Sequence, residues 1–138
     1  MLRPIHALPL LVTCLLVIGC RKLSPLESKL VGTWSVPQVS VAEDGSTPTG
    51  AANTTLRNDH IFWQSPSGAA RPVATSVLSG QWRVDGDQLI LHCTRASPGY
   101  LGMVGQDLRF IVTEFETNKF VAVNAENQNA RLVWTRVR

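Results

Sequence analysis

The pattern of hydrophobic and polar residues changes after the first twenty positions of the chain. Residues 8–18 form an almost continuous apolar stretch, whereas beyond Gly32 short apolar runs alternate with polar residues and end at turn-forming ones. A period of two is typical of β-strands that bury one face. The sequence therefore predicts an N-terminal leader followed by a domain made of strands.

Eight short segments of the domain have the composition of strands, and the connections between most of them are short. The segments are 33–36, 54–57, 61–64, 73–84, 88–94, 108–116, 120–123 and 131–137. Asp85-Gly86 predicts a two-residue hairpin turn, and Gly80 predicts a bulge or bend. Because such a meander must hide its edge strands, we expect an all-β, antiparallel up-and-down barrel of seven or eight strands.

The alternation also predicts which side chains point into this barrel. Four apolar pairs recur at the spacing of one strand face: Trp34 and Val36, Trp82 and Val84, Leu89 and Leu91, and Leu132 and Trp134. The positions on the opposite face are mostly polar, with Ile90 and Val133 as exceptions; the polar ones include Thr33, Ser35, Gln81, Arg83, Gln88, Arg131 and Thr135. We therefore expect these four pairs to line the interior.

A short helix is expected just before the first strand, within residues 23–31. Ser24 can cap it, Pro25 suits its first position, and Glu27 completes an S-x-x-E capping box. Gly32 leaves room for only about two turns. We expect this helix to act as a plug or strap on the barrel.

The leader has the features of a bacterial secretion signal. Arg3 provides a positive charge, and residues 8–18 are too few to span a bilayer comfortably. The stretch ends in Val17-Ile18-Gly19-Cys20, which resembles the lipobox of bacterial lipoproteins. This resemblance implies that residues 1–19 are removed and that Cys20 is acylated, and several acyl chains would anchor the protein stably.

The domain resembles small bacterial lipocalin-like lipoproteins in three places. Leu30–Trp34 resembles their G-x-W start, Gly80–Leu91 their central hairpin, and Ala130–Val137 their closing strand. The resemblance implies a calycin (lipocalin-like) barrel over residues 30–138, preceded by a tether and short helix at 20–29. It also implies that Arg131 or Arg136 packs over Trp34.

Composition and charge add few functional signals. The 138 residues are 44% hydrophobic and 17% charged, with a formal net charge of +3 from singly scattered basic residues. This is typical of a globular domain, and no basic run predicts nucleic-acid binding. Of the three cysteines, Cys14 lies in the leader and Cys20 is the acylation site. Cys93 lies in an apolar run, so we expect it to be buried.

Five aromatic residues are candidates for a ligand-binding wall: Trp34, Trp63, Trp82, Trp134 and Tyr100. Small barrels often fill their interior with such side chains, so a core role is the competing interpretation. Residues 97–105 combine three glycines with Tyr100, Leu101, Met103 and Val104. This loop predicts either a portal or partner contact, or a lid folded onto the core.

The sequence shows no catalytic or metal-binding motif. His60 and His92 are far apart and have no ligand spacing around them, and Glu114 and Glu116 share one face of a predicted strand. We therefore expect no cofactor, no metal and no enzymatic activity. A histidine paired with an acid inside a cleft would favour an enzyme instead.

Two functions follow as hypotheses. The first is a lipid-anchored cell-envelope lipoprotein, held on the periplasmic face of the outer membrane, whose barrel binds a small apolar ligand. An outer-membrane location is favoured by resemblance, because Arg21 rather than aspartate follows Cys20. The second is a module that binds an envelope protein, such as an assembly factor or an inhibitor of a secreted hydrolase.

Overall fold

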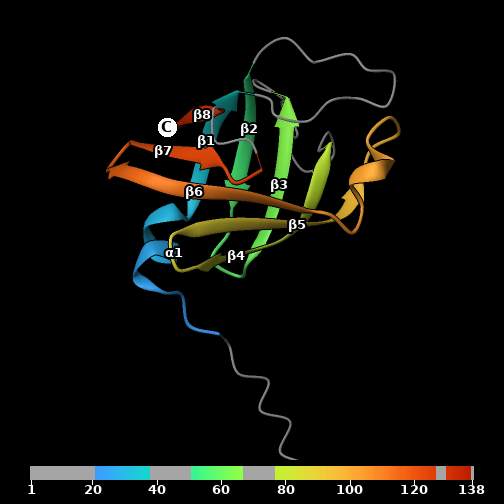
Figure 1. The fold of residues 1–138 in the computed structure, drawn as a ribbon. Helices are drawn as coiled ribbons and strands as arrows, with labels where there is room; N and C mark the ends of the chain where they lie inside the picture. The colour runs from blue at the N-terminus through green and yellow to red at the C-terminus, as the bar shows by residue number, and fades with distance from the viewer. Residues whose placement is uncertain (1–20, 38–50, 67–76, 127–129, 138) are drawn as a thin grey trace, which may run out of the picture.

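The computed structural model describes residues 21–37, 51–66, 77–126 and 130–137 (Figure 1). The predicted leader, the lipobox with Cys20, and residues 73–76 of the fourth predicted strand lie outside this part. The elements are α1 (Pro25–Leu30), β1 (Gly32–Pro37), β2 (Ala51–Leu56), β3 (Ile61–Pro66), β4 (Leu78–Asp85), β5 (Gln88–Ala96), the 3₁₀ turn η1 (Leu101–Met103), β6 (Asp107–Glu116), β7 (Lys119–Asn124) and β8 (Arg131–Arg136).

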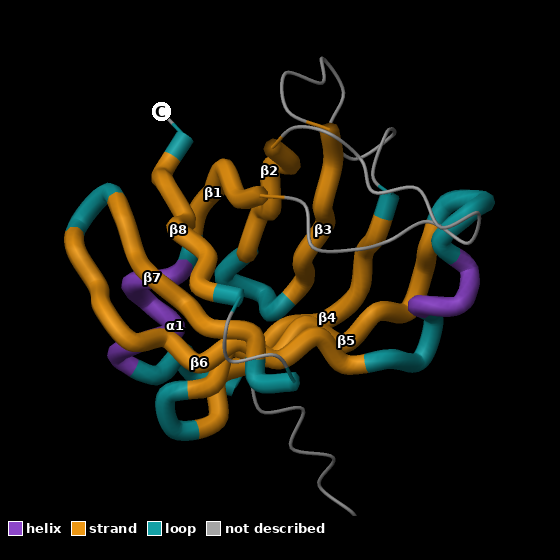
Figure 2. Tube along the Cα trace, turned by 45° about the horizontal axis from the view of Figure 1, so that its top comes forward, coloured by secondary structure: helices purple, strands orange, loops and turns teal. Residues whose placement is uncertain are grey.

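The eight strands form one closed antiparallel barrel in sequence order, which confirms the predicted fold class. Each strand pairs with the next, and β1 also pairs with β8 through Trp34–Arg136 and Ser35–Thr135, so the sheet closes. Helix α1 and the turn η1 lie on opposite sides of this barrel in both views (Figures 1 and 2). The architecture is compatible with a lipocalin-like fold.

The predicted capping box is present and also connects the helix to the barrel. The Glu27 amide donates to the Ser24 hydroxyl at 3.2 Å, and the Ser24 amide donates to Glu27 Oε2 at 2.8 Å. The other carboxylate oxygen, Oε1, accepts the amide of Val84 in β4 at 3.1 Å. Helix α1 is therefore fixed to β4 by its own capping residue, as expected of a strap.

Aromatic rings fill the interior of the barrel. The ring centroids of Trp34 and Phe120 are 4.7 Å apart, and those of Phe120 and Trp134 are 5.0 Å apart. The Phe110 and Trp134 rings meet edge-on, with centroids 5.4 Å apart. Trp82 is another large buried side chain of the same core. Rings at 4.5–7 Å in offset or edge-on geometry add stability beyond their buried area.

The predicted inward face is confirmed, with two departures. Val84 is only half-buried, although it still packs against the core. Ile90 is fully buried but belongs to the outer face, where the strand register pairs it with Arg83 and Arg109. The two long arginine stems flank the isoleucine, as expected where charged side chains cover apolar surface.

The strand boundaries and turns differ slightly from the prediction. Strand β2 begins at Ala51 instead of residue 54, and the hairpin turn falls at Gly86–Asp87, because Asp85 pairs with Gln88. Gly86 has a φ of 61°, which glycine adopts without strain. The predicted irregularity at Gly80 is confirmed, since the register shifts between Ser79 and Gly80.

Candidate functional site

One end of the barrel is closed by Arg136. Its guanidinium carbon lies 4.2 Å from the Trp34 ring centroid, and its nitrogens donate to the carbonyls of Lys29, Val31 and Thr117 at 3.0–3.1 Å. Of the two arginines implied by the resemblance, Arg136 is therefore the one over Trp34. Arg131 instead pairs with Glu114 on the exposed surface.

The five predicted ligand-wall residues do not form one site. Trp34, Trp82 and Trp134 are only 0–2% exposed and lie in the packed core. Tyr100 is half-buried and packs against this core from the loop before η1. Trp63 lies apart from them and lines a groove on the outside of the barrel.

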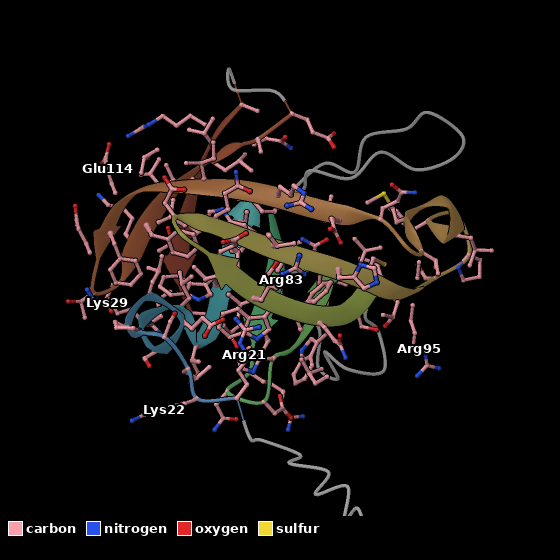
Figure 3. The ribbon with its side chains drawn as sticks, turned by 60° about the horizontal axis from the view of Figure 1, so that its bottom comes forward. Arg21, Lys22, Lys29, Arg83, Arg95 and Glu114 are labelled. Carbon is pink, nitrogen blue, oxygen red and sulfur yellow. The ribbon has the colours of Figure 1, made fainter. Side chains whose placement is uncertain are left out.

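The outer face over β4, β5 and β6 carries a groove of about 780 Å³, here called the β4–β6 groove. This volume is within the usual range for small-ligand sites. The lining residues are Arg21, Asp59, His60, Gln81, Trp82, Arg83, His92, Gly105, Gln106, Asp107, Arg109 and Glu126. In Figure 3, Arg21 and Arg83 lie together on the face turned to the viewer.

A chain of charged side chains crosses this groove. His92 Nδ1 lies 2.7 Å from Asp107 Oδ1, and Arg109 donates to Oδ2 of the same carboxylate at 2.9 Å. The hydrogen bond from His92 is the main reason why the pKa of Asp107 lies below its usual value, with smaller contributions from Arg109 and Arg83. These contacts therefore favour the ionised form of Asp107. The carboxylate orients the His92 ring through Nδ1, and Nε2 is the other polar atom of that ring.

A second histidine–acid pair lies at the same groove. His60 Nε2 is 3.5 Å from Oε1 of the buried Glu27, and the His60 ring lies over Trp82 at 5.5 Å. Burial raises the pKa of Glu27, but the amides of Ser24 and Val84 together with His60 outweigh it, and the pKa is lowered overall. His60 adopts a φ of 64°, which is unusual for a residue other than glycine.

Arg83 has no ion-pair partner in the part of the chain that the structure describes. The other two arginines of the β4–β6 groove do have acidic partners. Arg109 pairs with Asp107, and Arg21 lies 3.6 Å from Glu27. Arg83 nevertheless lies near enough to Asp107 to help lower its pKa. The guanidinium of Arg83 is therefore a charged donor in this groove that is free to bind an anion.

A second groove of about 590 Å³, here called the Trp63 groove, lies over β3, β4 and β5. It shares Gln81 with the β4–β6 groove, so the two grooves are neighbours at this residue. Arg57 lies over the Trp63 ring at 5.7 Å and pairs with Asp59 at 2.7 Å. Like Arg83, Arg95 in this groove makes no ion pair with any described residue.

The remaining candidates behave mostly as structural residues. Cys93 is fully buried, as predicted, and burial raises the pKa of its thiol, which keeps it unreactive. Glu114 and Glu116 make separate ion pairs with Arg131 and Lys119. Among the described residues there is no group of three or more potential metal ligands.

The loop at residues 97–105 has both packed and exposed apolar side chains, so its two predicted roles stay open. Met103 and Tyr100 pack against the core, as a lid would. Leu101 is 57% exposed and Val104 is also exposed, as a contact surface would be.

No helix within the described ranges is long and apolar enough to cross a membrane.

Sequence reasoning did not find the β4–β6 groove. The alternation identifies Gln81 and Arg83 as outward-facing, but His92 and Asp107 are fifteen positions apart and belong to different strands. Only the pairing of β5 with β6 brings them into contact.

A scan against protein-family models and a search of the curated proteins both found no match.

Proposed function

We propose that this protein is a lipid-anchored, lipocalin-like module of the cell envelope that binds an anionic ligand in the β4–β6 groove. The observation that supports this most is the guanidinium of Arg83, which has no ion-pair partner among the described residues and lies beside the His92–Asp107–Arg109 chain. A guanidinium offers several N–H donors in a planar fork that suits carboxylate and phosphate oxygens. Arg83, with Gln81 beside it on the same face of β4, is the proposed anchor for the charge.

The groove is a better candidate than the barrel interior that the sequence suggested. An apolar ligand inside the barrel would need space among Trp34, Phe120 and Trp134, whose rings pack against one another. Filling of this kind is usual in barrels of about eight strands. The apolar-ligand hypothesis stays a prediction, and a titration with an apolar fluorescent probe tests it. Saturable binding with a change in tryptophan emission would favour the interior and count against the groove.

Binding of inorganic phosphate and citrate, followed by amide NMR, tests the groove directly. We expect saturable shifts at Gln81, Arg83 and Arg109, because these residues surround the proposed site. The Arg83→Gln variant should weaken binding by about ten- to a hundredfold, since a charge-assisted hydrogen bond contributes roughly 1.5–3 kcal/mol. The matched Arg131→Gln variant should bind as the wild type does. Equal effects of both variants, or no saturable shift, would refute the proposal.

Acid–base catalysis is a second candidate, favoured by one contact. His92 paired with Asp107 inside a groove is the arrangement of a histidine base oriented by a carboxylate. No serine, threonine or cysteine is among the residues that line this groove, so His92 would have to activate water. If His92 acts as this base, the wild type should hydrolyse a phosphate ester or a carboxylic ester, and the His92→Gln variant should lose this activity. Unchanged hydrolysis in that variant would exclude a catalytic role for His92.

A further inference from the structure

We infer that the anionic group bound by the β4–β6 groove is the phosphate of an anionic membrane lipid, one whose headgroup carries a net negative charge, so that this face of the barrel rests on the bilayer. The inference rests on the proposed function, including acylation of Cys20. Its first support is position: Arg21, which follows Cys20 in the sequence, itself lines the β4–β6 groove. An acyl anchor at Cys20 would therefore hold the groove within one residue of the headgroups.

The charges on this face suit such a surface. Arg83 and Arg95 make no ion pair with a described residue, and Lys22 is exposed next to Arg21. Figure 3 shows Arg21 and Arg83 close together on the face turned to the viewer, with Lys22 below them, Arg95 apart toward the right edge, and Glu114 at the upper left. Basic residues near an anionic leaflet favour its surface, and each one raises the binding constant about fivefold.

The aromatic and aliphatic residues on this face also favour contact with a membrane surface. Ile61 is 37% exposed, and Trp63 lies beside it on β3 with Arg57 over its ring. Tryptophan and arginine are typical of the headgroup level, where an apolar body meets a polar surface. The Trp63 groove would thus contact the interface while Arg83 binds a phosphate.

The opposing charges of the groove are mostly neutralised within the protein. Asp59 pairs with Arg57, and Asp107 pairs with His92 and Arg109. Glu126 is the remaining acidic residue of the lining and is exposed. Its side chain should oppose an approaching phosphate, so the Glu126→Gln variant should bind an anionic surface more tightly.

Spin labelling of the acylated protein in vesicles tests the inference. A nitroxide at the exposed Thr94→Cys on β5 reports the Trp63 groove from outside the proposed anion site, and a nitroxide at the exposed Thr135→Cys on β8 is the matched control. The readout is collision with a water-soluble nickel chelate in phosphatidylcholine vesicles, with and without phosphatidylglycerol. We expect phosphatidylglycerol to lower the collision rate at position 94 at least fivefold and to leave position 135 unchanged.

Variants in the same background identify the residues that cause this protection. Arg83→Glu and Arg95→Glu should each abolish it, whereas Arg131→Glu should not, and Arg83→Gln gives a milder change with less risk to folding. Glu126→Gln should retain or increase the protection. Because these contacts are electrostatic, high salt should remove it as well.

The outcomes separate this inference from the proposed function. If phosphate and citrate bind at Arg83 in solution but position 94 stays accessible on both kinds of vesicle, the inference is overturned. The ligand would then be a soluble anion or an acidic protein. Protection at both positions, or protection without phosphatidylglycerol, would mean that the acyl chains alone set the orientation, and this also overturns it. If no anion binds at all, both proposals fail.

Discussion

At the scale of single residues, Arg136 and Glu27 connect the N-terminal helix to the barrel. Arg136 donates to three carbonyls and covers Trp34, so it joins the end of α1, β8 and the β6–β7 turn. Glu27 caps α1 and also accepts the amide of Val84. Each of these two side chains therefore contacts elements other than its own, which local helix or strand propensity alone would not require.

Replacing Arg136 should weaken the whole fold. The Arg136→Ala variant leaves three carbonyls without their charged donor and removes the cation–π contact with Trp34. We expect a loss of about 2 kcal/mol in the free energy of unfolding, measured by urea denaturation. Arg131→Ala is the matched control on the same strand, and its exposed ion pair should contribute less than about 1 kcal/mol. Equal losses in the two variants would contradict this role of Arg136.

The buried carboxylate of Glu27 should make stability depend on pH. Arg21 and His60 face it, and its pKa in the folded protein lies below the ordinary value of 4.5. The contribution is therefore complete above that value and is lost as the pH falls through the lower, folded-state pKa. The wild type should exceed Glu27→Gln by about 2 kcal/mol at pH 7. This difference should shrink in urea titrations as the pH falls below 4.5, and a difference independent of pH would refute it.

At the scale of elements, β4 and β5 approach closely where their register shifts, between Ser79 and Gly80. A Cβ atom at Gly80 would collide with the carbonyl oxygen of His92 in β5. The alternation predicted an irregularity here, but the reason for glycine is the neighbouring backbone. Gly86 differs, because its positive φ is required by the hairpin turn and nothing lies within 4 Å of its missing Cβ.

Two substitutions separate these roles of glycine. Gly80→Ala should lower the free energy of unfolding by about 2 kcal/mol, since β4 and β5 must move apart. Gly86→Asn should change it by less than about 0.5 kcal/mol, because asparagine tolerates a positive φ and meets no neighbour. Thermal and urea denaturation measure both. A tolerated Gly80→Ala would show that the bulge can relax without cost.

At the scale of the whole molecule, the filled barrel and the outer groove suggest that recognition occurs on the surface. Within the described residues each strand pairs with a neighbour on both sides, which favours recognition by side chains over strand addition. The lining residues of the β4–β6 groove come from strands β4, β5 and β6, from the β2–β3 turn, from the segments next to β6 and β7, and from Arg21 near the predicted anchor. Acylation at Cys20 would therefore determine which surface this groove faces.

The anchor itself is tested by expressing the full chain in a Gram-negative bacterium. We expect mass spectrometry of the membrane fraction to find a protein that begins at an acylated Cys20. The Cys20→Ala variant should lose the membrane association, because several acyl chains are needed for stable anchoring. The Cys14→Ala variant is the control and should be processed normally. A wild-type protein that retains Met1 would refute the predicted leader.

The sequence alone determined the fold class, the capped helix, the β4–β5 hairpin and the inward face. These features depend on local rules: a period of two, a capping box and turn-forming residues lie close together in the chain. Ile90 was the main exception, because an alternation cannot show that arginines on neighbouring strands will flank an outward side chain.

Only the tertiary structure showed which distant side chains line the outer grooves. His92 meets Asp107, and Glu27 meets His60, through strand register and helix docking that no spacing in the sequence encodes. The tryptophans illustrate the same limit, since composition cannot distinguish a packed interior from a pocket wall. Packing volume and long-range pairing are properties of the closed barrel as a whole, so they appear only when the chain has folded.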